Sequence, residues 1–226
     1  MSIVSKKVYV FGGVGVASSI AMAMIDARQR GASDLEFCGY INNRDGISEL
    51  DGFPVVQSFD EIPRLIEEGC QFIYTFYKID GQLARIGLFE SLNIPDENLA
   101  TFIHPDSFVA PNCTIGPGTV ILPQSTISGN AKLGRCVRIN SQVAIGHDCV
   151  LGEHTFVGGG TAMASEGVTG KAAYIGLGAR ILGKARIAEY SVVGMGSVVT
   201  RNVAPYELVT GNPARFRRYV KDRPAD

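Results

Sequence analysis

Hydrophobic positions recur along the second half of the chain with a period of six residues. From Val109 to Val199 an apolar residue returns at every sixth position, and Thr169 is the one polar residue in the series. A small or β-branched residue follows each of them four positions later, from Cys113 to Val203. The fifth position of one hexad and the first of the next are two residues apart, so both side chains point to the same face of a short strand.

The remaining residues of each hexad form a turn. Most of these turns contain glycine or asparagine, which tolerate the backbone angles of a sharp corner. Three hexads make one coil, and stacked coils bury a continuous column of apolar side chains. The series gives about five coils, a prism on the order of 25 Å long at about 4.8 Å per layer. The pattern therefore predicts a parallel β-helix over residues 104–203, and the number of agreeing positions disfavours an unrelated antiparallel β domain.

Residues 1–103 have a different pattern, in which strands alternate with helices. Strands are predicted at 7–11, 37–41 and 72–76, and helices at 17–30, 59–68 and 82–92. This alternation indicates a small parallel sheet, a βαβ (Rossmann-like) domain that binds its ligand at the carboxyl ends of the strands. Residues 204–226 follow the last hexad as a C-terminal tail.

A glycine-rich turn after the first strand is the candidate ligand site of this domain. Gly12, Gly13 and Gly15 precede the first helix, where a turn of this kind suits a phosphate. The same glycines are equally consistent with a tight turn that touches no ligand, because Ser18 stands at the third glycine position of the dinucleotide-binding pattern. The acidic residue expected after the second strand is replaced by Asn42 and Asn43. We expect substrate-binding residues at Gly12, Gly13, Gly15, Asn42, Asn43, Lys78 and Asn140.

Composition narrows the class of protein. The 226 residues are 46% hydrophobic and include 27 glycines, which fits a globular protein with many turns. A net charge of −1 gives no global attraction to nucleic acid or to an anionic membrane. No apolar run approaches the roughly 18 residues of a membrane span, and no signal-peptide pattern is present. The five cysteines lack paired spacing and agree with a reducing compartment, so we predict a cytoplasmic protein.

His147 and Asp148 are the sharpest candidate for chemistry. They hold the third and fourth positions of a hexad, so both lie in a turn and face outward rather than into the apolar column. Asp148 is placed to hold one ring nitrogen and leave the other as a general base, although a solvated histidine beside a turn-forming aspartate is the alternative. Ser165 lies one coil further along the same corner, where its backbone N–H or hydroxyl is placed to meet an oxyanion.

The other two histidines leave a metal site as an alternative. His154 lies at another corner, and His104 precedes the coils. Together with His147 they would supply three zinc ligands if neighbouring prisms packed side by side. No further histidine exists in the chain, so we expect no metal.

Two segments carry a resemblance to a known family. Residues 140–161, NSQVAIGHDCVLGEHTFVGGGT, and 209–215, VTGNPAR, resemble bacterial nucleotide-sugar N-acetyltransferases of the hexapeptide-repeat class, and are similar to the bacillosamine and perosamine N-acetyltransferases. The resemblance extends over nearly the whole chain, and its most specific parts are the Gly-His-Asp-Cys turn and the closing Gly-Asn-Pro-Ala. Two departures are Asn42-Asn43 in place of paired aspartates and Phe156 in place of a second histidine that some members carry.

The resemblance implies a fold and an activity. The prism would be a left-handed β-helix, His147 the general base and Asp148 the acid that orients it. Acetyl-CoA would lie in the groove between neighbouring prisms of a homotrimer. The reaction implied is acetyl transfer to the amine of a nucleotide-linked sugar, such as a 4-amino-4,6-dideoxy sugar for surface polysaccharide or glycan biosynthesis. We expect cofactor-binding residues at Ser165, Gly146, Arg215, Arg217 and Arg218, although a charged tail is more often simply solvated.

Two other functions remain open from the sequence. One is O-acetylation of a sugar hydroxyl, as in the sialic-acid O-acetyltransferases, which would demand more of the base because a hydroxyl is the weaker nucleophile. The other is a non-catalytic trimeric module that binds a sugar nucleotide.

Outward apolar positions support the predicted threefold assembly. These positions suggest a prism side more apolar than a solvated face requires. They are Val120, Ala144, Val150, Ala162, Val168 and Val198.

Overall fold

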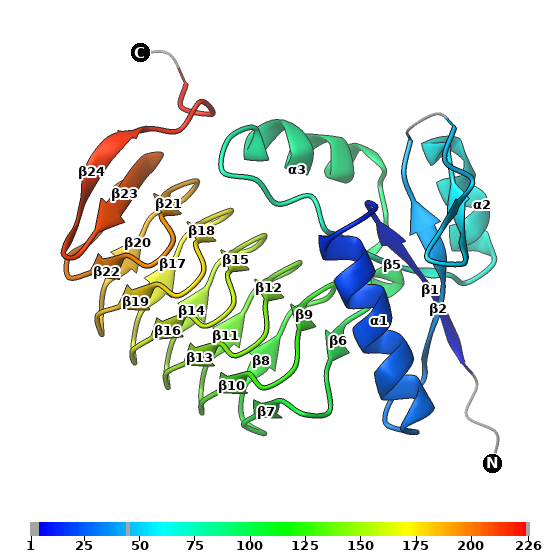
Figure 1. The fold of residues 1–226 in the computed structure, drawn as a ribbon, viewed down its shortest axis with the longest axis horizontal. Helices are drawn as coiled ribbons and strands as arrows, with labels where there is room; N and C mark the ends of the chain where they lie inside the picture. Colours follow the sequence, from blue (N-terminus) through cyan, green and yellow to red (C-terminus); the bar gives the residue numbers. More distant parts are fainter. Residues whose placement is uncertain (1–4, 44–45, 225–226) are drawn as a thin grey trace.

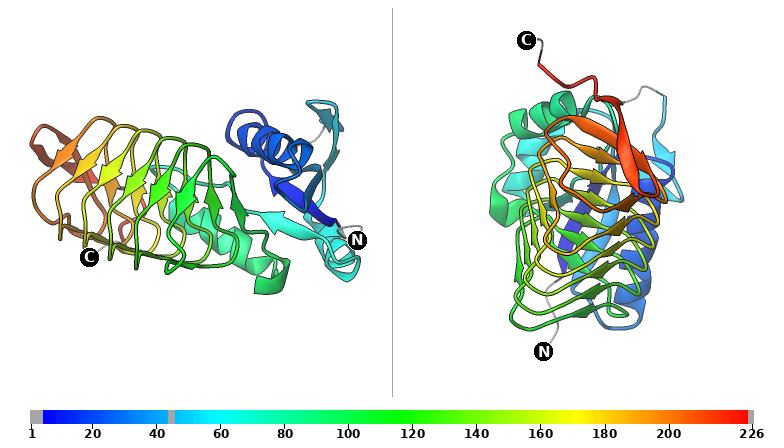
Figure 2. Two further views of the ribbon diagram at one scale, coloured as in Figure 1. Left: turned by 90° about the horizontal axis from the view of Figure 1, so that it is seen from below. Right: turned by 90° about the vertical axis from the view of Figure 1, so that its left-hand side faces the viewer.

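The computed structural model describes residues 5–43 and 46–224 of the chain. A small α/β domain is followed by a parallel β-helix, and a two-stranded hairpin covers the far end of the prism (Figure 1). In the end-on view of Figure 2 the coils are stacked on one another along the prism axis. Among the described residues, no helix is both long enough and apolar enough to cross a membrane.

The first domain contains a five-stranded sheet in the order β3-β4-β2-β1-β5. Its strands are β1 (Lys6–Phe11), β2 (Leu35–Ile41), β3 (Glu49–Leu50), β4 (Phe53–Val56) and β5 (Gln71–Ile73). Its helices are α1 (Val16–Gln29), η1 (Phe59–Glu61), α2 (Ile62–Glu67), α3 (Gln82–Ser91) and η2 (Asp96–Asn98). The parallel pairing of β4, β2, β1 and β5 confirms the predicted βαβ arrangement.

The hairpin between β3 and β4 is an element that the sequence analysis missed. Asp51 and Gly52 connect the two antiparallel strands with φ angles of 53° and 79°. Positive φ at both central residues is the type I′ turn that an Asp-Gly pair favours, so the dipeptide was the available signal. The third predicted strand, expected at residues 72–76, is also shorter: β5 ends at Ile73.

The prism has three faces built from strands of two residues each. The first face contains β6 (Phe102–Ile103), β9 (Val120–Ile121), β12 (Arg138–Ile139), β15 (Phe156–Val157), β18 (Tyr174–Ile175) and β21 (Val192–Val193). The second face contains β7 (Phe108–Val109), β10 (Thr126–Ile127), β13 (Ala144–Ile145), β16 (Ala162–Met163), β19 (Arg180–Ile181) and β22 (Val198–Val199). The third face contains β8 (Thr114–Ile115), β11 (Lys132–Leu133), β14 (Val150–Leu151), β17 (Val168–Thr169) and β20 (Arg186–Ile187).

A left-handed residue recurs at the corners of the prism. From Gly118 to Gly196 the fourth position of every hexad has a φ between 52° and 72°, whether the residue is glycine, aspartate, histidine or tyrosine. This angle turns the chain sharply enough for the next two-residue strand to begin on a new face. The first and fifth positions then point inward and form one continuous core from Ile121 to Val209. The hexad prediction is therefore confirmed in its inward and turn positions.

The apolar outward positions do not share one side of the prism, which corrects that part of the sequence analysis. Ala144, Ala162 and Val198 lie on the second face, whereas Val150 and Val168 lie on the third. The sixth of them, Val120, lies on the first face and is buried in a cluster with side chains of the first domain. Because three hexads make one coil, only positions separated by a multiple of 18 residues share a face, as Ala144 and Ala162 do.

The first domain packs on the first face of the prism and on one of its corners. One apolar cluster joins α1 and the sheet to Phe102, Val120 and Leu122 of the first coils. A second cluster joins α3 to a corner of the prism through Phe89, Cys136 and other residues. The two parts of the chain therefore share buried surface rather than meeting through an open linker.

The C-terminal tail forms a hairpin. β23 (Glu207–Gly211) pairs with β21 of the last complete coil, and β24 (Ala214–Tyr219) pairs antiparallel with β23. The peptide bond between Asn212 and Pro213 in the connecting turn is cis. The buried side chain of Ala214 joins the prism core, so the hairpin closes the apolar column.

Thr169, the polar residue of the apolar series, has hydrogen-bond partners in the core. Its Oγ1 lies 2.9 Å from Oγ1 of Thr155 and accepts a 3.1 Å hydrogen bond from the backbone N–H of Gly152. Thr155 also contacts the carbonyl oxygen of Gly170 at 3.3 Å. The hydroxyl therefore belongs to a buried network and is not a gap in the pattern.

We predict that Thr169→Val lowers the free energy of unfolding by about 1 kcal/mol, because the hydroxyl of Thr155 loses its side-chain partner inside the core. The double variant Thr155→Val/Thr169→Val should recover part of the loss, since it removes both buried hydroxyls. Urea unfolding of the two single variants and the double variant measures this coupling. A Thr169→Val protein as stable as the parent would show that the network contributes nothing.

Candidate active site

His147 and Asp148 form the turn between β13 and β14. The imidazole Nδ1 lies 2.7 Å from Oδ2 of Asp148, and the His147 side chain is 59% exposed. The hydrogen bond to His147 and, to a smaller extent, one to Asn130 lower the pKa of the Asp148 carboxyl below its ordinary value. Because an ionised carboxylate only accepts, Nδ1 carries the proton and donates it. The free Nε2 is then available to accept a proton from a substrate.

The corner that holds this pair continues through the neighbouring coils. The backbone N–H of Asp148 donates to the carbonyl of Gly129, and the N–H of Glu166 donates to the carbonyl of His147. Asp148 tolerates the left-handed φ of 58° at this position better than most residues. The structure therefore places Ser165 one coil beyond His147 on the same corner, as the spacing predicts.

Gly146 has a close backbone neighbour at this corner. A Cβ atom at Gly146 would lie 2.5 Å from the backbone nitrogen of Ser165. Glycine at this position therefore lets the backbone of the next coil stack directly against it, which brings the Ser165 amide beside the turn that carries His147.

An apolar groove of about 480 Å³ runs along the second face and reaches this corner. Small outward residues such as Ala144 and Ala162 leave the space, and Gly146 lines the groove immediately before His147. Three further coils contribute Ser128, Ala164 and Leu182 at the equivalent turn position. The groove therefore offers an extended apolar surface that ends beside the candidate base.

A second cavity, of about 460 Å³, lies at the carboxyl ends of the strands of the first domain. It brings together most of the predicted substrate-binding residues. Those that line it are Gly12, Gly13, Asn42, Asn43 and Lys78. Its remaining walls include Phe59, Phe76 and Arg85, which the sequence analysis did not single out. Arg85 lies in the first turn of α3, shortly after Lys78 in the sequence. A second cation so near a predicted substrate-binding lysine was the signal available for it.

The glycines of this cavity have steric reasons to be glycines. A Cβ atom at Gly12 would lie 2.7 Å from Oγ1 of Thr75, and Gly12 has a φ of 116°. A Cβ atom at Gly13 would lie 3.0 Å from Nδ2 of Asn42. Gly15 is the N-cap residue of α1, has a φ of 100° and is not part of the cavity lining. The turn therefore needs glycine for its own geometry, whether or not a ligand is bound.

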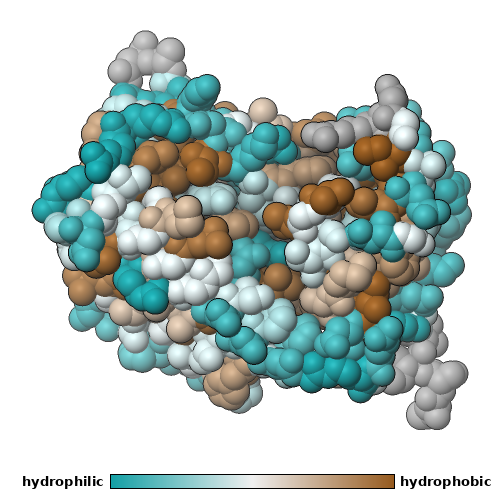
Figure 3. All heavy atoms as spheres, viewed as in Figure 1, coloured by the Kyte–Doolittle hydropathy of each residue, from teal (hydrophilic) through white to brown (hydrophobic). Residues whose placement is uncertain are grey.

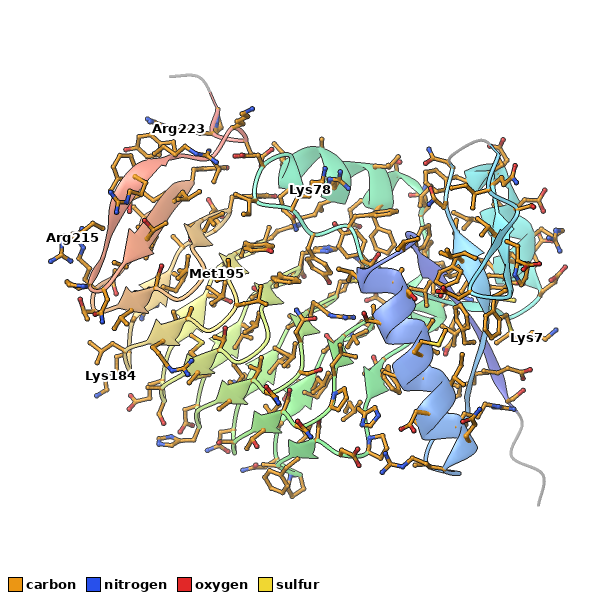
Figure 4. All side chains as sticks on the ribbon, viewed as in Figure 1. Lys7, Lys78, Lys184, Met195, Arg215 and Arg223 are labelled. Carbon is orange, nitrogen blue, oxygen red and sulfur yellow. The ribbon has the colours of Figure 1, made fainter. Side chains whose placement is uncertain are left out.

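The cavity and His147 lie on opposite sides of one chain. Lys184 belongs to the same corner as His147, since its N–H donates to the carbonyl of Ser165. Figure 4 shows Lys184 at the lower left edge of the prism and Lys78 beside α3 at the top. The hydropathy view in Figure 3, from the same direction as Figure 1, shows separate apolar patches on the surface. One chain by itself does not bring Lys78 and His147 together.

Asn140 is engaged within its own chain. Its Nδ2 donates to the carbonyl of Val157 at 3.0 Å, and its Oδ1 accepts from Nε of Arg138 at 3.3 Å. Arg138 is buried on the first face, and its pKa is lowered to about 10 by burial. Asn140 lies at the corner between the first and second faces, away from the corner of His147. These contacts make Asn140 a link between coils.

The three arginines of the tail differ in their surroundings. Arg215 and Arg217 are exposed on β24, and Arg217 donates to Oγ1 of Thr210 at 2.7 Å. Arg218 instead forms a bidentate ion pair with Asp80 of the first domain, at 2.9 and 3.0 Å. None of the three lines the apolar groove.

The other two histidines occupy separate buried positions. His154 contacts Tyr74 and Phe89, and its Nε2 lies 3.2 Å from Oε1 of Glu90 on α3. The Nε2 of His104 lies 3.3 Å from Oδ2 of Asp26 on α1. Within residues 5–43 and 46–224, no group of three or more histidine, cysteine, aspartate or glutamate side chains is placed to hold a metal ion.

Solved structures give a clear set of similar proteins, whereas no protein-family profile and no curated protein matches the sequence. PerB from Caulobacter crescentus, crystallised with CoA and GDP-perosamine, is 26% identical, with a TM-score of 0.76 over 94% of this chain and 97% of PerB. The acetyltransferase domain of PglB from Neisseria gonorrhoeae is 22% identical, with a TM-score of 0.81 over 94% of this chain and all 100% of that domain. WeeI from Acinetobacter baumannii is 24% identical, with a TM-score of 0.76 over 94% of this chain and 100% of WeeI.

The chain is similar to bacterial sugar N-acetyltransferases. The resemblance indicated by the sequence motifs is thereby confirmed. So is the fold class, a small α/β domain followed by a left-handed parallel β-helix.

Acid should destabilise the protein through His154. Burial lowers the pKa of His154 from 6.5 to about 4. The unfolded chain therefore binds a proton at a pH where the folded protein does not, and the free energy of unfolding falls as pH drops from about 6.5 towards 4. Urea unfolding at several pH values measures the slope, and His154→Gln should flatten it. A slope unchanged in that variant would assign the effect to other groups.

Proposed function

We propose that the protein transfers an acetyl group from acetyl-CoA to the amine of a nucleotide-linked amino-deoxy sugar. The observation that carries this proposal is the His147–Asp148 pair at the end of an apolar groove, in a chain that also has a separate cavity with two cationic side chains. PerB, which shares both parts of the fold, was crystallised with CoA and with a nucleotide-linked sugar. A 4-amino-4,6-dideoxy sugar for surface glycan biosynthesis is the substrate class we favour.

The chemistry follows from the geometry of the turn. The sugar amine attacks the thioester carbonyl, and Nε2 of His147 accepts the proton that the nitrogen loses. The C–S bond then breaks, and the proton passes from His147 to the departing thiolate. Asp148 stabilises the imidazolium that exists between these steps. The backbone N–H of Ser165 is our candidate donor to the tetrahedral oxyanion.

The apolar groove is the proposed site of the pantetheine arm of acetyl-CoA. Its alanine and glycine lining matches a thin, largely apolar chain, and its end at Gly146 would leave the thioester beside His147. The exposed guanidinium groups of Arg215 and Arg217 are our candidates for the phosphates of the coenzyme. We do not place Arg218 among them, because its guanidinium is already paired with Asp80.

The cavity of the first domain is the proposed site of the nucleotide. Lys78 and Arg85 supply positive charge for a diphosphate, and the N-terminus of α1 follows the Gly12–Gly13 turn. Asn42 and Asn43 offer amide groups that can both donate and accept hydrogen bonds. Phe59 and Phe76 give the cavity aromatic walls.

A homotrimer would complete the active site. Within one chain Lys78 lies far from Lys184, which shares the corner of His147, so a sugar bound in one chain needs the base of another. The apolar second face also exposes more apolar surface than a solvated face requires. We infer threefold assembly, with each site formed by His147 of one chain and the nucleotide cavity of its neighbour. We place the reaction in the cytoplasm, consistent with free thiols at all five cysteines.

The direct test is thiol release from acetyl-CoA in the presence of a panel of nucleotide-linked sugars. Each amino sugar is paired with the corresponding hydroxyl sugar, and the acetylated product is identified by mass spectrometry. Release with the amine alone supports N-acetylation. Release with the hydroxyl alone would favour O-acetylation, and binding without release would favour a non-catalytic module.

His147→Asn should lower kcat by roughly 10²- to 10⁴-fold while the protein stays folded, because the residue lies on an exposed turn and acts as the base. Asp148→Asn should cost less, since the base remains and only its orientation and charge partner are lost. Glu166→Gln, one coil further along the same corner, is the matched control and should keep near-parental turnover. Near-normal turnover of His147→Asn would contradict the mechanism.

Shared sites can be detected by complementation. A His147→Ala chain and a Lys78→Ala/Arg85→Ala chain should each be inactive as pure trimers. When the two are co-refolded, some interfaces contain an intact base and an intact nucleotide cavity, so turnover should return in part. Mixtures that stay inactive although both parents are trimeric would place the whole site within one chain, and a monomer in sedimentation would remove the assembly.

A further inference from the structure

The segment after β24 binds the loop that precedes α3. The Asp80 carboxylate accepts two hydrogen bonds from Arg218, at 2.9 and 3.0 Å, and a third from the backbone N–H of Lys221 at 2.9 Å. In return, Oδ2 of Asp222 accepts from the backbone N–H groups of Gly81 and Gln82, both at 2.9 Å. Each segment therefore contributes one carboxylate that holds the other, and we call this contact the tail clamp.

The clamp supplies the N-terminal cap of α3. The helix begins at Gln82, and its N-cap residue Gly81 has a left-handed φ of 82° and no side chain to accept a hydrogen bond. Asp222 replaces that missing cap and places a negative charge at the positive end of the helix dipole. Figure 1 shows the segment after β24 reaching the end of α3 where the helix begins.

The tail side of the clamp is anchored to the prism. Val220 is buried, and its N–H donates to the carbonyl of Tyr206 at 2.8 Å. Tyr206 stacks on Tyr190, a corner residue of the prism, with their ring centroids 5.4 Å apart. On the other side of the clamp, the hydrogen bond from Arg218 lowers the pKa of the Asp80 carboxyl, so the ion pair persists across the neutral pH range. The clamp therefore connects the prism to the first domain.

The clamped loop carries the cations of the nucleotide cavity. The backbone N–H of Lys78 donates to Oε1 of Gln82 at 2.9 Å, and the Gln82 side chain is itself buried. Lys78 and Arg85 both line the cavity, one before and one after the helix start. The same residue, Gln82, thus bonds to Asp222 through its backbone and to Lys78 through its side chain.

We propose that Arg218 and Asp222 are positioning residues for the nucleotide cavity. They fix the loop 78–82 and the first turn of α3 so that Lys78 and Arg85 face the diphosphate of the bound nucleotide sugar. This inference rests on the proposed function of that cavity. It assigns Arg218 and the segment after β24 a role in acceptor binding, whereas Arg215 and Arg217 stay the candidates for the coenzyme phosphates.

The test compares ligand affinities of variants that remain folded. In Asp222→Ala and Arg218→Ala, the Kd for UDP or GDP, whichever the parent binds, should rise about tenfold, while the Kd for CoA stays unchanged. Asp222→Asn keeps an acceptor oxygen and should restore much of the nucleotide affinity. The charge swap Asp80→Arg/Arg218→Asp should restore part of it. Lys171→Ala, which breaks an exposed ion pair with Glu153 and leaves Asp80, Arg218 and Asp222 in place, is the matched control.

Hydrogen exchange in the free protein gives a second measurement. The amides of Gly81 and Gln82 should exchange faster in Asp222→Ala than in the parent, because Asp222 is their acceptor. Faster exchange with unchanged nucleotide affinity would overturn the inference and leave the proposed function standing. If the parent transfers no acetyl group but the variants bind the nucleotide more weakly than the parent does, the inference is supported and the proposed function is overturned. A parent that binds neither UDP nor GDP would overturn both.

Discussion

The stacking of one coil on the next is the constraint on which the rest of the structure depends. Each two-residue strand pairs in register with the equivalent strand of the next coil, as Thr126 does with Ala144 and Ala144 with Ala162. This register is accompanied by one left-handed residue at each corner from Gly118 to Gly196. Because the register leaves no freedom at the corners, it also fixes where chemistry can be placed: His147 and Asp148 are held outward by the backbone of the coils on either side.

The same constraint explains why the candidate site is divided. A prism corner offers a rigid base and an apolar groove beside it, but no deep cavity for a large acceptor. The α/β domain provides that cavity at the carboxyl ends of its strands, on the opposite side of the chain. Each part of the fold thus supplies what the other lacks, and symmetry between copies is the simplest way to join them.

Periodicity predicted the prism well because every inward position obeys one rule, and the same rule correctly placed His147 and Asp148 on an exposed turn. Its 18-residue repeat also separates the outward residues by face, a distinction that the prediction did not use when it grouped Val120 with residues of two other faces. The burial of Val120 by the first domain depends on contacts between distant segments and has no such signal. Periodicity also treated Thr169 as an exception, because a buried hydroxyl pair with Thr155 depends on two side chains from different hexads. Contacts between distant segments, such as Arg218 with Asp80, have no local signal in the sequence.

The cap that Asp222 gives to α3 has a consequence for the modularity of this architecture. The first domain has its own sheet and looks separable, yet the start of one of its helices is completed by a residue 140 positions further along the chain. Closing so long a loop is costly in chain entropy, and the prism offsets that cost by holding the tail in place. We therefore expect that a first domain grafted alone onto another prism would lose the Asp222 hydrogen bonds at the start of α3.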